Sequence, residues 1–369
     1  MPHLLPHRAV AALAAALLSS GCAAINQQVD HWALEMKADM VMEQKLTWTP
    51  GVDLPYRSSE ELEELTRPRG LPEVSFAPLA RHHQLDDPTV TQEELRFTSA
   101  IPLRFKEAAV AKAYVYRHGA LGERMVLLVV PGQNVSERDF STFAAFFGQA
   151  LQRDMDVVFF VPPYHLDRTP AGYGSGDAFL ATDFIDHLYA FAQELTDLRS
   201  LTAWLRSRGV KDLGAFGGSM GGTMVLRLIG WEPLFDFVTA MQPVIDWNDL
   251  IRRPEMAPVR ARLREQGVSD EDVMLAYHSI DPRTAISPKI GPERISLLYG
   301  RYDLIAAEGP LLALKRQWGV GRVRIYDRGH AFITVGGKPV RDMGASLDAD
   351  LRVLRWRRYI LRLIEKPVW

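Results

Sequence analysis

A serine flanked by glycines is the feature of this 369-residue chain that most directly implies chemistry. Ser219 lies in the run Gly-Gly-Ser-Met-Gly-Gly of residues 217–222, between an apolar strand-like segment and an apolar helical segment. A serine on such a sharp turn has a strained backbone, which neighbouring glycines allow because they lack Cβ atoms. The turn exposes the Ser219 hydroxyl and directs the N–H of Met220 at the same space. We therefore predict Ser219 as a nucleophile and Met220 as an oxyanion donor.

Two simpler interpretations of this run are a glycine-rich turn with an incidental serine and a phosphate-binding loop. A phosphate-binding loop of this kind carries a lysine at the start of the helix. No lysine stands there. The nucleophile therefore remains the favoured interpretation.

A serine hydroxyl is a weak nucleophile by itself and needs a base that a third group orients. Where the serine lies on a strand-to-helix turn, its partners follow it in the chain, the acid first. Two histidines follow Ser219, namely His278 and His330. His330 comes just after the last expected strand, whereas His278 lies in a polar helical stretch. We predict His330 as the base.

The third group is expected to be a carboxylate at the end of a strand. Asp303 follows the apolar segment 295–299 and Gly300. From there its carboxylate reaches the far ring nitrogen of the histidine and fixes the tautomer. Asp246, after the preceding strand, is the alternative, and Asp327 is less favoured because it points sideways on the strand that leads to His330. Any of them could instead be a solvated loop carboxylate.

A second oxyanion donor is expected in the loop after the strand of residues 125–130. That loop reads Pro-Gly-Gln-Asn at residues 131–134. Gly132 lets the backbone turn tightly, which leaves the N–H of Gln133 as the expected partner of Met220. The other interpretation is a loop that only leads the chain out of the strand.

A proline-bounded loop at residues 163–170 follows another strand at the same edge of the sheet. We expect Tyr164, His165 and Arg168 to line the substrate entrance, where tyrosine and arginine would hold a polar headgroup or a carboxylate. A rigid loop with exposed polar tips is an equally simple interpretation.

Strands and helices alternate from about residue 96, which is the order that must bring these residues together. Continuous apolar runs at 125–130 and 156–161 are typical of strands buried on both faces. Repeated strand-then-helix order predicts an α/β fold with a mostly parallel, doubly wound sheet. We expect a signal peptide at 1–21, a tether and N-terminal wrapping segment at 22–95, and one α/β domain at 96–369 with a cap-like helical insertion at 247–288.

Composition excludes several classes of protein. The formal charge of −2 gives no basic field for nucleic acid, and a single cysteine permits neither an intramolecular disulfide nor a cysteine-based zinc site. The expected chemistry requires no metal and no organic cofactor.

The one cysteine, Cys22, follows an apolar run at 9–18 and the small residues Ser-Ser-Gly. This leader resembles the lipobox of bacterial lipoproteins, which implies a lipidated Cys22, a membrane anchor and a place in the bacterial cell envelope. Ala23 after the cysteine favours the outer membrane. A plain cleaved signal and an N-terminal helix with an incidental cysteine are the alternatives.

The order of the serine turn, Asp303 and His330 resembles the α/β-hydrolase superfamily over residues 96–369. The loop 163–170 and the serine turn are more specifically similar to the alpha/beta hydrolase domain-containing protein 18 type. The resemblance implies a serine hydrolase that acts on ester or acyl bonds of a small molecule or a lipid. Acyl transfer and perhydrolysis would use the same residues. The competing hypothesis is a non-catalytic, membrane-anchored lipoprotein that uses the fold as a binding or scaffolding module.

Overall fold

Nine strands form one sheet in the computed structural model, which describes residues 23–43, 53–181, 183–334 and 337–364. From edge to edge the strands are β1 (Ser75–Pro78), β2 (Thr91–Thr98), β3 (Val110–Arg117), β5 (Met155–Val161), β4 (Met125–Val130), β6 (Leu213–Gly218), β7 (Phe237–Met241), β8 (Ile295–Gly300) and β9 (Arg322–Tyr326). Strands from β5 to β9 run parallel, whereas β1, β2 and β3 pair antiparallel with their neighbours. The predicted mostly parallel sheet is confirmed.

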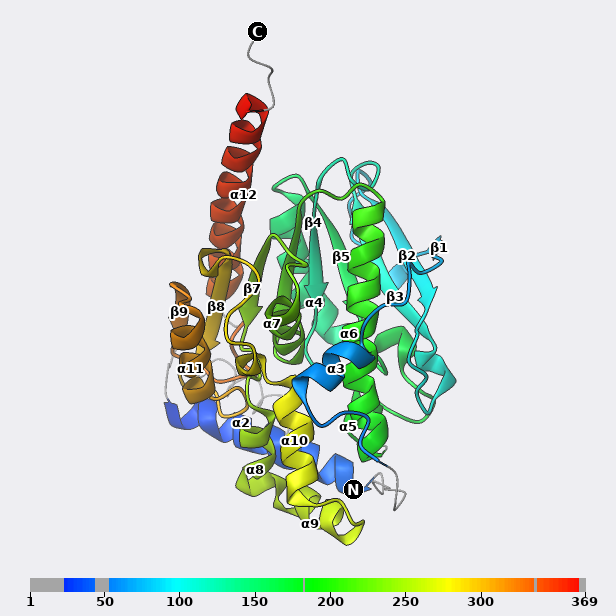
Figure 1. Cartoon of the computed structure of the whole chain (residues 1–369), viewed down its shortest axis with the longest axis vertical. Coiled ribbons are helices and arrows are strands. Elements are labelled where there is room, and N and C mark those ends of the chain that lie inside the picture. The colour runs from blue at the N-terminus through cyan, green and yellow to red at the C-terminus, as the bar shows by residue number, and fades with distance from the viewer. Residues whose placement is uncertain (1–22, 44–52, 182, 335–336, 365–369) are drawn as a thin grey trace, which may run out of the picture.

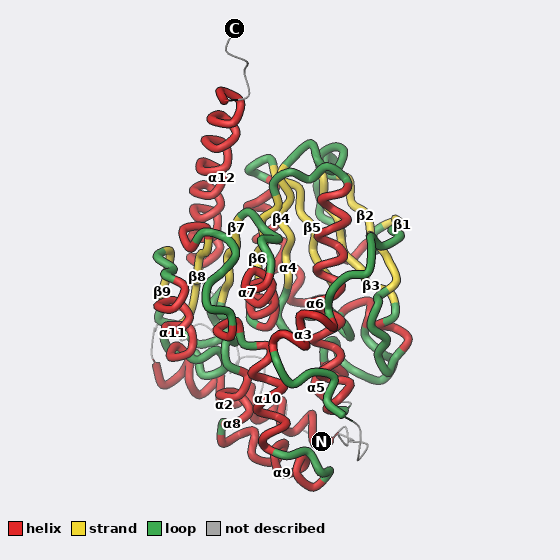
Figure 2. The backbone as a smooth tube through the Cα atoms, viewed as in Figure 1, coloured by secondary structure: helices red, strands yellow, loops and turns green. Residues whose placement is uncertain are grey.

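The central strands are apolar because helices cover both faces of the sheet (Figure 2). Every residue of β4, β5, β6, β7 and β8 is buried. Helices α6 (Phe184–Ser207), α7 (Met220–Trp231) and α11 (Glu308–Trp318) contribute to the core on one face. Helices α4 (Glu137–Leu151) and α12 (Lys338–Ile364) contribute to the core on the other. The chain has an α/β-hydrolase fold, as the sequence predicts.

The segment expected to be a tether and a wrapping segment contains regular structure. Helix α2 (Ala23–Glu43) and helix α3 (Ser59–Leu65) precede two strands, β1 and β2, that extend the main sheet. The expected domain start at residue 96 falls inside β2, so that boundary is wrong. Strand β1 has only four residues, Ser-Phe-Ala-Pro, and lies mostly exposed at the edge of the sheet, so its sequence shows no alternating pattern long enough to indicate a strand.

The insertion after β7 is helical, as expected. Helices α8 (Trp247–Arg252), α9 (Ala257–Glu265) and α10 (Asp270–Ile280) lie at one end of the sheet, and α2 lies beside them (Figure 1). Helix α2 packs against α9 and against the 3-10 turn η4 (Pro254–Met256). The helical cover at this end therefore comes from two distant parts of the chain.

Residues 1–21 and Cys22, which carry the expected signal peptide and lipidation site, lie outside the described residues. Within the described ranges no helix combines the length and the apolarity needed to cross a membrane.

Candidate active site

Ser219 occupies a strained turn between β6 and α7. Its backbone has φ 50° and ψ −118°, a conformation that residues with a side chain rarely adopt. A Cβ atom on Gly221 would lie 2.2 Å from the carbonyl oxygen of Val130, so this turn requires glycine there. The Ser219 N–H donates to the carbonyl of Met241 at 2.8 Å, which ties the turn to β7. These contacts hold the strained backbone that the glycine-rich run predicts.

The Ser219 hydroxyl, His330 and Asp303 form one hydrogen-bonded chain. The Oγ atom of Ser219 is 2.9 Å from Nε2 of His330, and Nδ1 of His330 is 2.8 Å from Oδ2 of Asp303. The other oxygen of Asp303 accepts the N–H groups of Ile305 and Ala306 at 2.9 and 2.7 Å. Because the carboxylate accepts the Nδ1 proton, Nε2 is left as the acceptor for the serine proton.

The surroundings of His330 favour its protonated form. Burial lowers the pKa of His330, but the charge and hydrogen bond of Asp303, with the charge of Asp30, outweigh burial and raise that pKa above its ordinary 6.5. A base with a raised pKa accepts the serine proton more readily, and the same groups stabilise the imidazolium that results.

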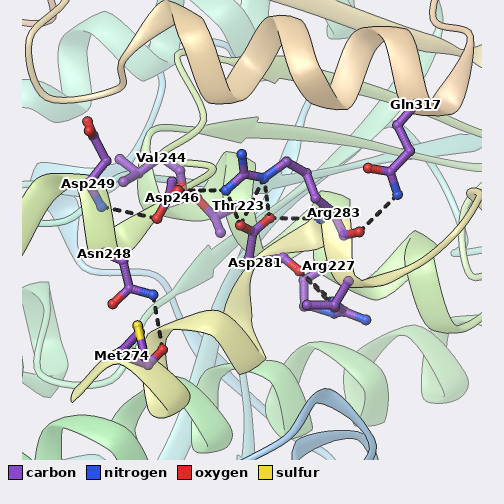
Figure 3. Close-up of polar contacts among 11 residues, drawn as sticks. Thr223, Arg227, Val244, Asp246, Asn248, Asp249, Met274, Asp281, Arg283 and Gln317 are labelled. Atoms are coloured by element: carbon purple, nitrogen blue, oxygen red, sulfur yellow. Dashed lines mark hydrogen bonds and ion pairs between the residues drawn. The ribbon is translucent and has the colours of Figure 1, made fainter. Parts of the chain in front are cut away.

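The alternative acids and the alternative base lie elsewhere. Asp246 caps α8 by accepting the N–H of Asp249 at 3.0 Å, and it pairs with Arg283 at 2.6 Å (Figure 3). Asp327 pairs with Arg301 at 3.3 Å, and His278 is exposed on α10. Only Asp303 of the three carboxylates contacts His330.

The loop of residues 131–134 lies directly against Ser219. A Cβ atom on Gly132 would be 2.9 Å from the Cβ of Ser219, so only glycine allows this close approach. Gln133, Asn134, Ser219 and His330 line a common cleft of about 270 Å³, which we call the Ser219 cleft. The N–H of Gln133 has no hydrogen-bond acceptor among the described residues. It is therefore free for an oxyanion, alongside the first N–H of α7 at Met220, and these two roles remain predictions.

Tyr164, His165 and Arg168 do not line the substrate entrance, which corrects the expectation. All three are fully buried and none lines the Ser219 cleft. The Tyr164 hydroxyl donates to Asp186 at 2.8 Å. Arg168 donates to the carbonyls of Val161 and Ala108 and pairs with the buried Asp197 at 3.1 Å. The loop faces inward because its hydroxyl and guanidinium groups satisfy buried carbonyl and carboxylate acceptors, which would otherwise lack hydrogen-bond donors.

His165 instead supports the loop of residues 131–134, which we call the oxyanion loop after its predicted role. Its Nδ1 is 2.7 Å from the carbonyl of Pro163, and its Nε2 accepts the N–H of Asn134 at 3.0 Å. Burial lowers the pKa of His165 to about 3, which keeps the ring neutral, as an accepting Nε2 requires. Asn134 itself has φ 63°, so this bond helps to hold a strained backbone beside Gln133.

Helix α2 contributes three residues to the site that the sequence did not indicate. The Asp30 carboxylate, which is fully buried, accepts the N–H groups of His330 at 2.9 Å and of Leu304 at 3.1 Å. Asn26 accepts the N–H of Gly329 at 2.8 Å. Burial raises the pKa of Asp30, and the N–H groups that it accepts oppose that rise. The loops that carry the acid and the histidine are thus joined through α2.

Lys37 is the third of these residues. Its ammonium contacts the side-chain oxygens of Gln133 and Asn134. Its side chain also lines a second, mostly apolar cavity, which we call the α2 cavity. Residues of α2 and of the insertion line it, together with Phe184. Burial lowers the pKa of Lys37 to about 8. Lys37 therefore stands between the Ser219 cleft and this α2 cavity, a position that depends on tertiary packing and leaves no motif in the sequence.

The fold and the site define the class: an α/β-hydrolase-fold protein with a Ser–His–Asp hydrogen-bonded chain. A family model described as the prolyl oligopeptidase family matches residues 182–296, which include the serine turn. Acetyl xylan esterase 1 from Thermoanaerobacterium sp. JW/SL YS485 is similar in structure, with a TM-score of 0.54, 15% identity, and coverage of 82% of this chain and 97% of that one. An acetyl xylan esterase from Paenibacillus sp. R4 also has a TM-score of 0.54, with 14% identity and coverage of 85% and 97%.

No curated protein sequence matches the chain significantly. The similarity to the alpha/beta hydrolase domain-containing protein 18 type therefore stays a prediction. The family match and the structural neighbours support, in the broad sense, a serine hydrolase of the α/β-hydrolase fold.

Proposed function

We propose that the chain is a serine hydrolase that cleaves ester or acyl bonds through an acyl-enzyme on Ser219. The observation that carries the proposal is the continuous hydrogen-bonded chain from the Ser219 hydroxyl through His330 to Asp303. A strained turn holds the hydroxyl at the cleft, so little reorganisation is needed before attack. This arrangement also argues against a purely scaffolding role for the fold.

In the proposed reaction the Ser219 oxygen attacks the substrate carbonyl while Nε2 of His330 takes the hydroxyl proton. The carbonyl oxygen becomes negative and is stabilised by the N–H groups of Met220 and Gln133. His330 then returns the proton to the leaving group, which departs as an alcohol and leaves the acyl group on Ser219. Water, deprotonated by His330, releases the acid and restores the hydroxyl.

An ester with a small acyl group is the proposed substrate class. Apolar side chains, among them Val135, Phe143 and Ile333, line the Ser219 cleft and would contact such a group. The two structural neighbours named above are both called acetyl xylan esterases, which agrees with a small acyl group. Lys37 stands between the cleft and the α2 cavity, so a long acyl chain would meet its side chain.

Labelling with a fluorophosphonate probe tests the proposal. We expect one probe per wild-type chain and none in the Ser219→Ala variant. A Ser207→Ala variant, which removes an exposed hydroxyl at the end of α6, serves as the control and should label like the wild type. Folded wild-type protein that takes up no probe would instead favour the non-catalytic binding module.

Peptide or amide hydrolysis is the second candidate, and the prolyl oligopeptidase family match favours it. A pair of substrates with the same acyl group, one a p-nitrophenyl ester and the other a p-nitroanilide, separates the two. We expect turnover of the ester to exceed that of the anilide by more than their difference in intrinsic reactivity. If the protein accelerates both reactions by a similar factor over the uncatalysed rates, the chain would instead be assigned as a peptidase.

We also propose that Cys22 is lipidated and holds the protein at the bacterial cell envelope. Acyl chains contribute about 0.8 kcal/mol per buried CH₂, enough in combination for a stable anchor. Mass spectrometry of the mature N-terminus and membrane fractionation test this proposal. A Cys22→Ala variant should lose both the lipid and the membrane fraction, whereas an unmodified Cys22 in the wild type contradicts the proposal.

A further inference from the structure

Four potential metal-ligating side chains lie close together outside the lining of the Ser219 cleft. His82 and His83 lie in the 3-10 turn η1 (Arg81–His83) between β1 and β2, Glu137 is the first residue of α4, and Asp167 lies in the 3-10 turn η3 (Leu166–Arg168). One nitrogen or oxygen atom from each lies within 4.8 Å of the others. Three separate segments of the chain therefore present ligand atoms to one point.

The four side chains are close enough to share one ion, to which His83 can offer only one of its two ring nitrogens. Nε2 of His83 is 3.0 Å from Oε2 of Glu137, and Nε2 of His82 is 3.5 Å from Oε1 of the same carboxylate. Nδ1 of His83 is 3.9 Å from Oδ2 of Asp167. Two ligand atoms that are each about 2.1 Å from a tetrahedral zinc ion are separated by about 3.4 Å.

The environment of His83 supports the metal site as well as the distances do. Its side chain is fully buried, yet neither ring nitrogen has a hydrogen-bond partner among the described residues. Its Nε2 is 3.0 Å from Oε2 of Glu137, within the range of an ion pair. Buried polar atoms are normally satisfied, and a fully buried imidazole between two carboxylates is a setting in which a cation would satisfy all three groups.

Neighbouring groups fix the ligands in place. The His83 ring stacks on Tyr114, with centroids 4.3 Å apart, and the carbonyl of His83 accepts the Tyr116 hydroxyl at 2.8 Å. The Tyr114 hydroxyl donates to Oδ2 of Asp167 at 2.9 Å. Hydrogen bonds to ligating carboxylates of this kind orient them around metals.

We propose that His82, His83, Glu137 and Asp167 bind one divalent transition-metal ion, with Zn²⁺ the best match to two imidazoles and two carboxylates. The ion has a structural role. Glu137 is three residues after Asn134, and Asp167 is two residues from His165, which accepts the N–H of Asn134. The metal thus joins the two segments that hold the oxyanion loop, and takes no part in the proton transfers at Ser219.

Zinc binding to the untagged full chain, after dialysis against a chelator, tests the proposal. Calorimetry with ZnCl₂ and metal analysis after gel filtration should show one zinc per chain. His82→Ala and Glu137→Gln, whose side chains are about half exposed, should each weaken binding at least about 10-fold. Zinc should also raise the Tm of the wild type and not that of these variants.

Two controls make the result specific. His278→Ala removes an exposed histidine on α10, and Ser219→Ala removes the proposed nucleophile; both should bind zinc as the wild type does. The proposal is overturned if the wild type takes up no stoichiometric zinc, or if His82→Ala and Glu137→Gln bind it with unchanged affinity. Zinc binding and labelling by the fluorophosphonate probe are measured independently. A wild type that takes up no probe would contradict the proposed hydrolase and leave the proposed metal site in place.

Discussion

The Asp30 carboxylate accepts a hydrogen bond from the backbone N–H of His330 at 2.9 Å, although 300 residues separate the two in the chain. The same carboxylate accepts the N–H of Leu304, the residue after Asp303. One buried side chain from α2 therefore holds the loop of the proposed acid and the loop of the proposed base together. This makes α2 part of the site and gives Asp30 the role of a positioning residue.

Asp30→Asn is expected to lower kcat about 10- to 100-fold, because small displacements of His330 are costly to proton transfer. The negative charge of Asp30 helps to raise the pKa of His330, so its removal lowers that pKa. His330 must be neutral to act as a base. Because the pKa of His330 is raised in the wild type, the acid limb of the kcat/KM profile should move to lower pH in Asp30→Asn.

Asp39→Asn is the matched control, because Asp39 is an exposed carboxylate on the same helix. Its pH–rate profile should coincide with that of the wild type. An Asp30→Asn enzyme with lower kcat but an unshifted acid limb would show a structural role for Asp30 without electrostatic influence on His330.

Asp303→Asn should reduce kcat about 10³- to 10⁴-fold, because the amide fixes the wrong histidine tautomer. Asp246→Asn, which breaks the pair with Arg283 instead, should leave kcat within a few-fold of the wild type. Steady-state kinetics with a p-nitrophenyl ester compares them directly. A reversal of the two effects would reassign the acid to Asp246.

Lys37→Met should change the preferred acyl-chain length. The variant removes the ammonium that contacts Gln133 and Asn134 and puts an apolar side chain beside the α2 cavity. We expect the ratio of kcat/KM for octanoyl over acetyl esters to rise at least about 10-fold. Lys211→Met, at an exposed position remote from the cavity, is the control. An unchanged ratio in Lys37→Met would mean that the α2 cavity takes no part in acyl binding.

Arg168→Met should destabilise the protein without a specific effect on substrate binding. The change leaves the buried Asp197 without its cation, at a cost of about 3 kcal/mol or more in the free energy of unfolding. Urea denaturation measures this loss, and the double variant Arg168→Met/Asp197→Leu should recover part of it. A raised KM at unchanged stability would restore the interpretation of Arg168 as a substrate contact.

The sequence predicts those parts of the site that local backbone geometry and strand order determine. Ser219 has a backbone φ of 50°, and close contacts around it require glycine at 217 and 221, so these local constraints leave a motif. Asp303 and His330 are identified because parallel strands all end at one edge of the sheet, so residues after them meet there. Asp303 and Asp246 are in equivalent local settings, and only their partners in space distinguish them.

The inward-facing loop at 163–170 shows the limit of such reasoning. Its polar residues have the composition of an exposed loop, yet Arg168 is fully buried because the backbone carbonyls of β5 and η2 (Lys106–Ala108) and the Asp197 carboxylate accept its hydrogen bonds. The same holds for α2, where Asp30 and Lys37 have the pattern of an ordinary polar helix. The environment of each side chain depends on other segments: Asp30 contacts residues 274 and 300 positions away, and Lys37 contacts residues 96 and 97 positions away.

The sequence by itself therefore determined the fold class, the serine and the histidine, and limited the favoured acids to Asp303 and Asp246, since strand patterning and a strained turn are local properties that nearby residues specify. The tertiary structure alone decided the rest of the site: the α2 helix over the loops, the buried support beneath Asn134, and the cluster of His82, His83, Glu137 and Asp167. These depend on contacts between distant segments, and a hydrogen bond or ligand set across such distances needs no motif in the chain.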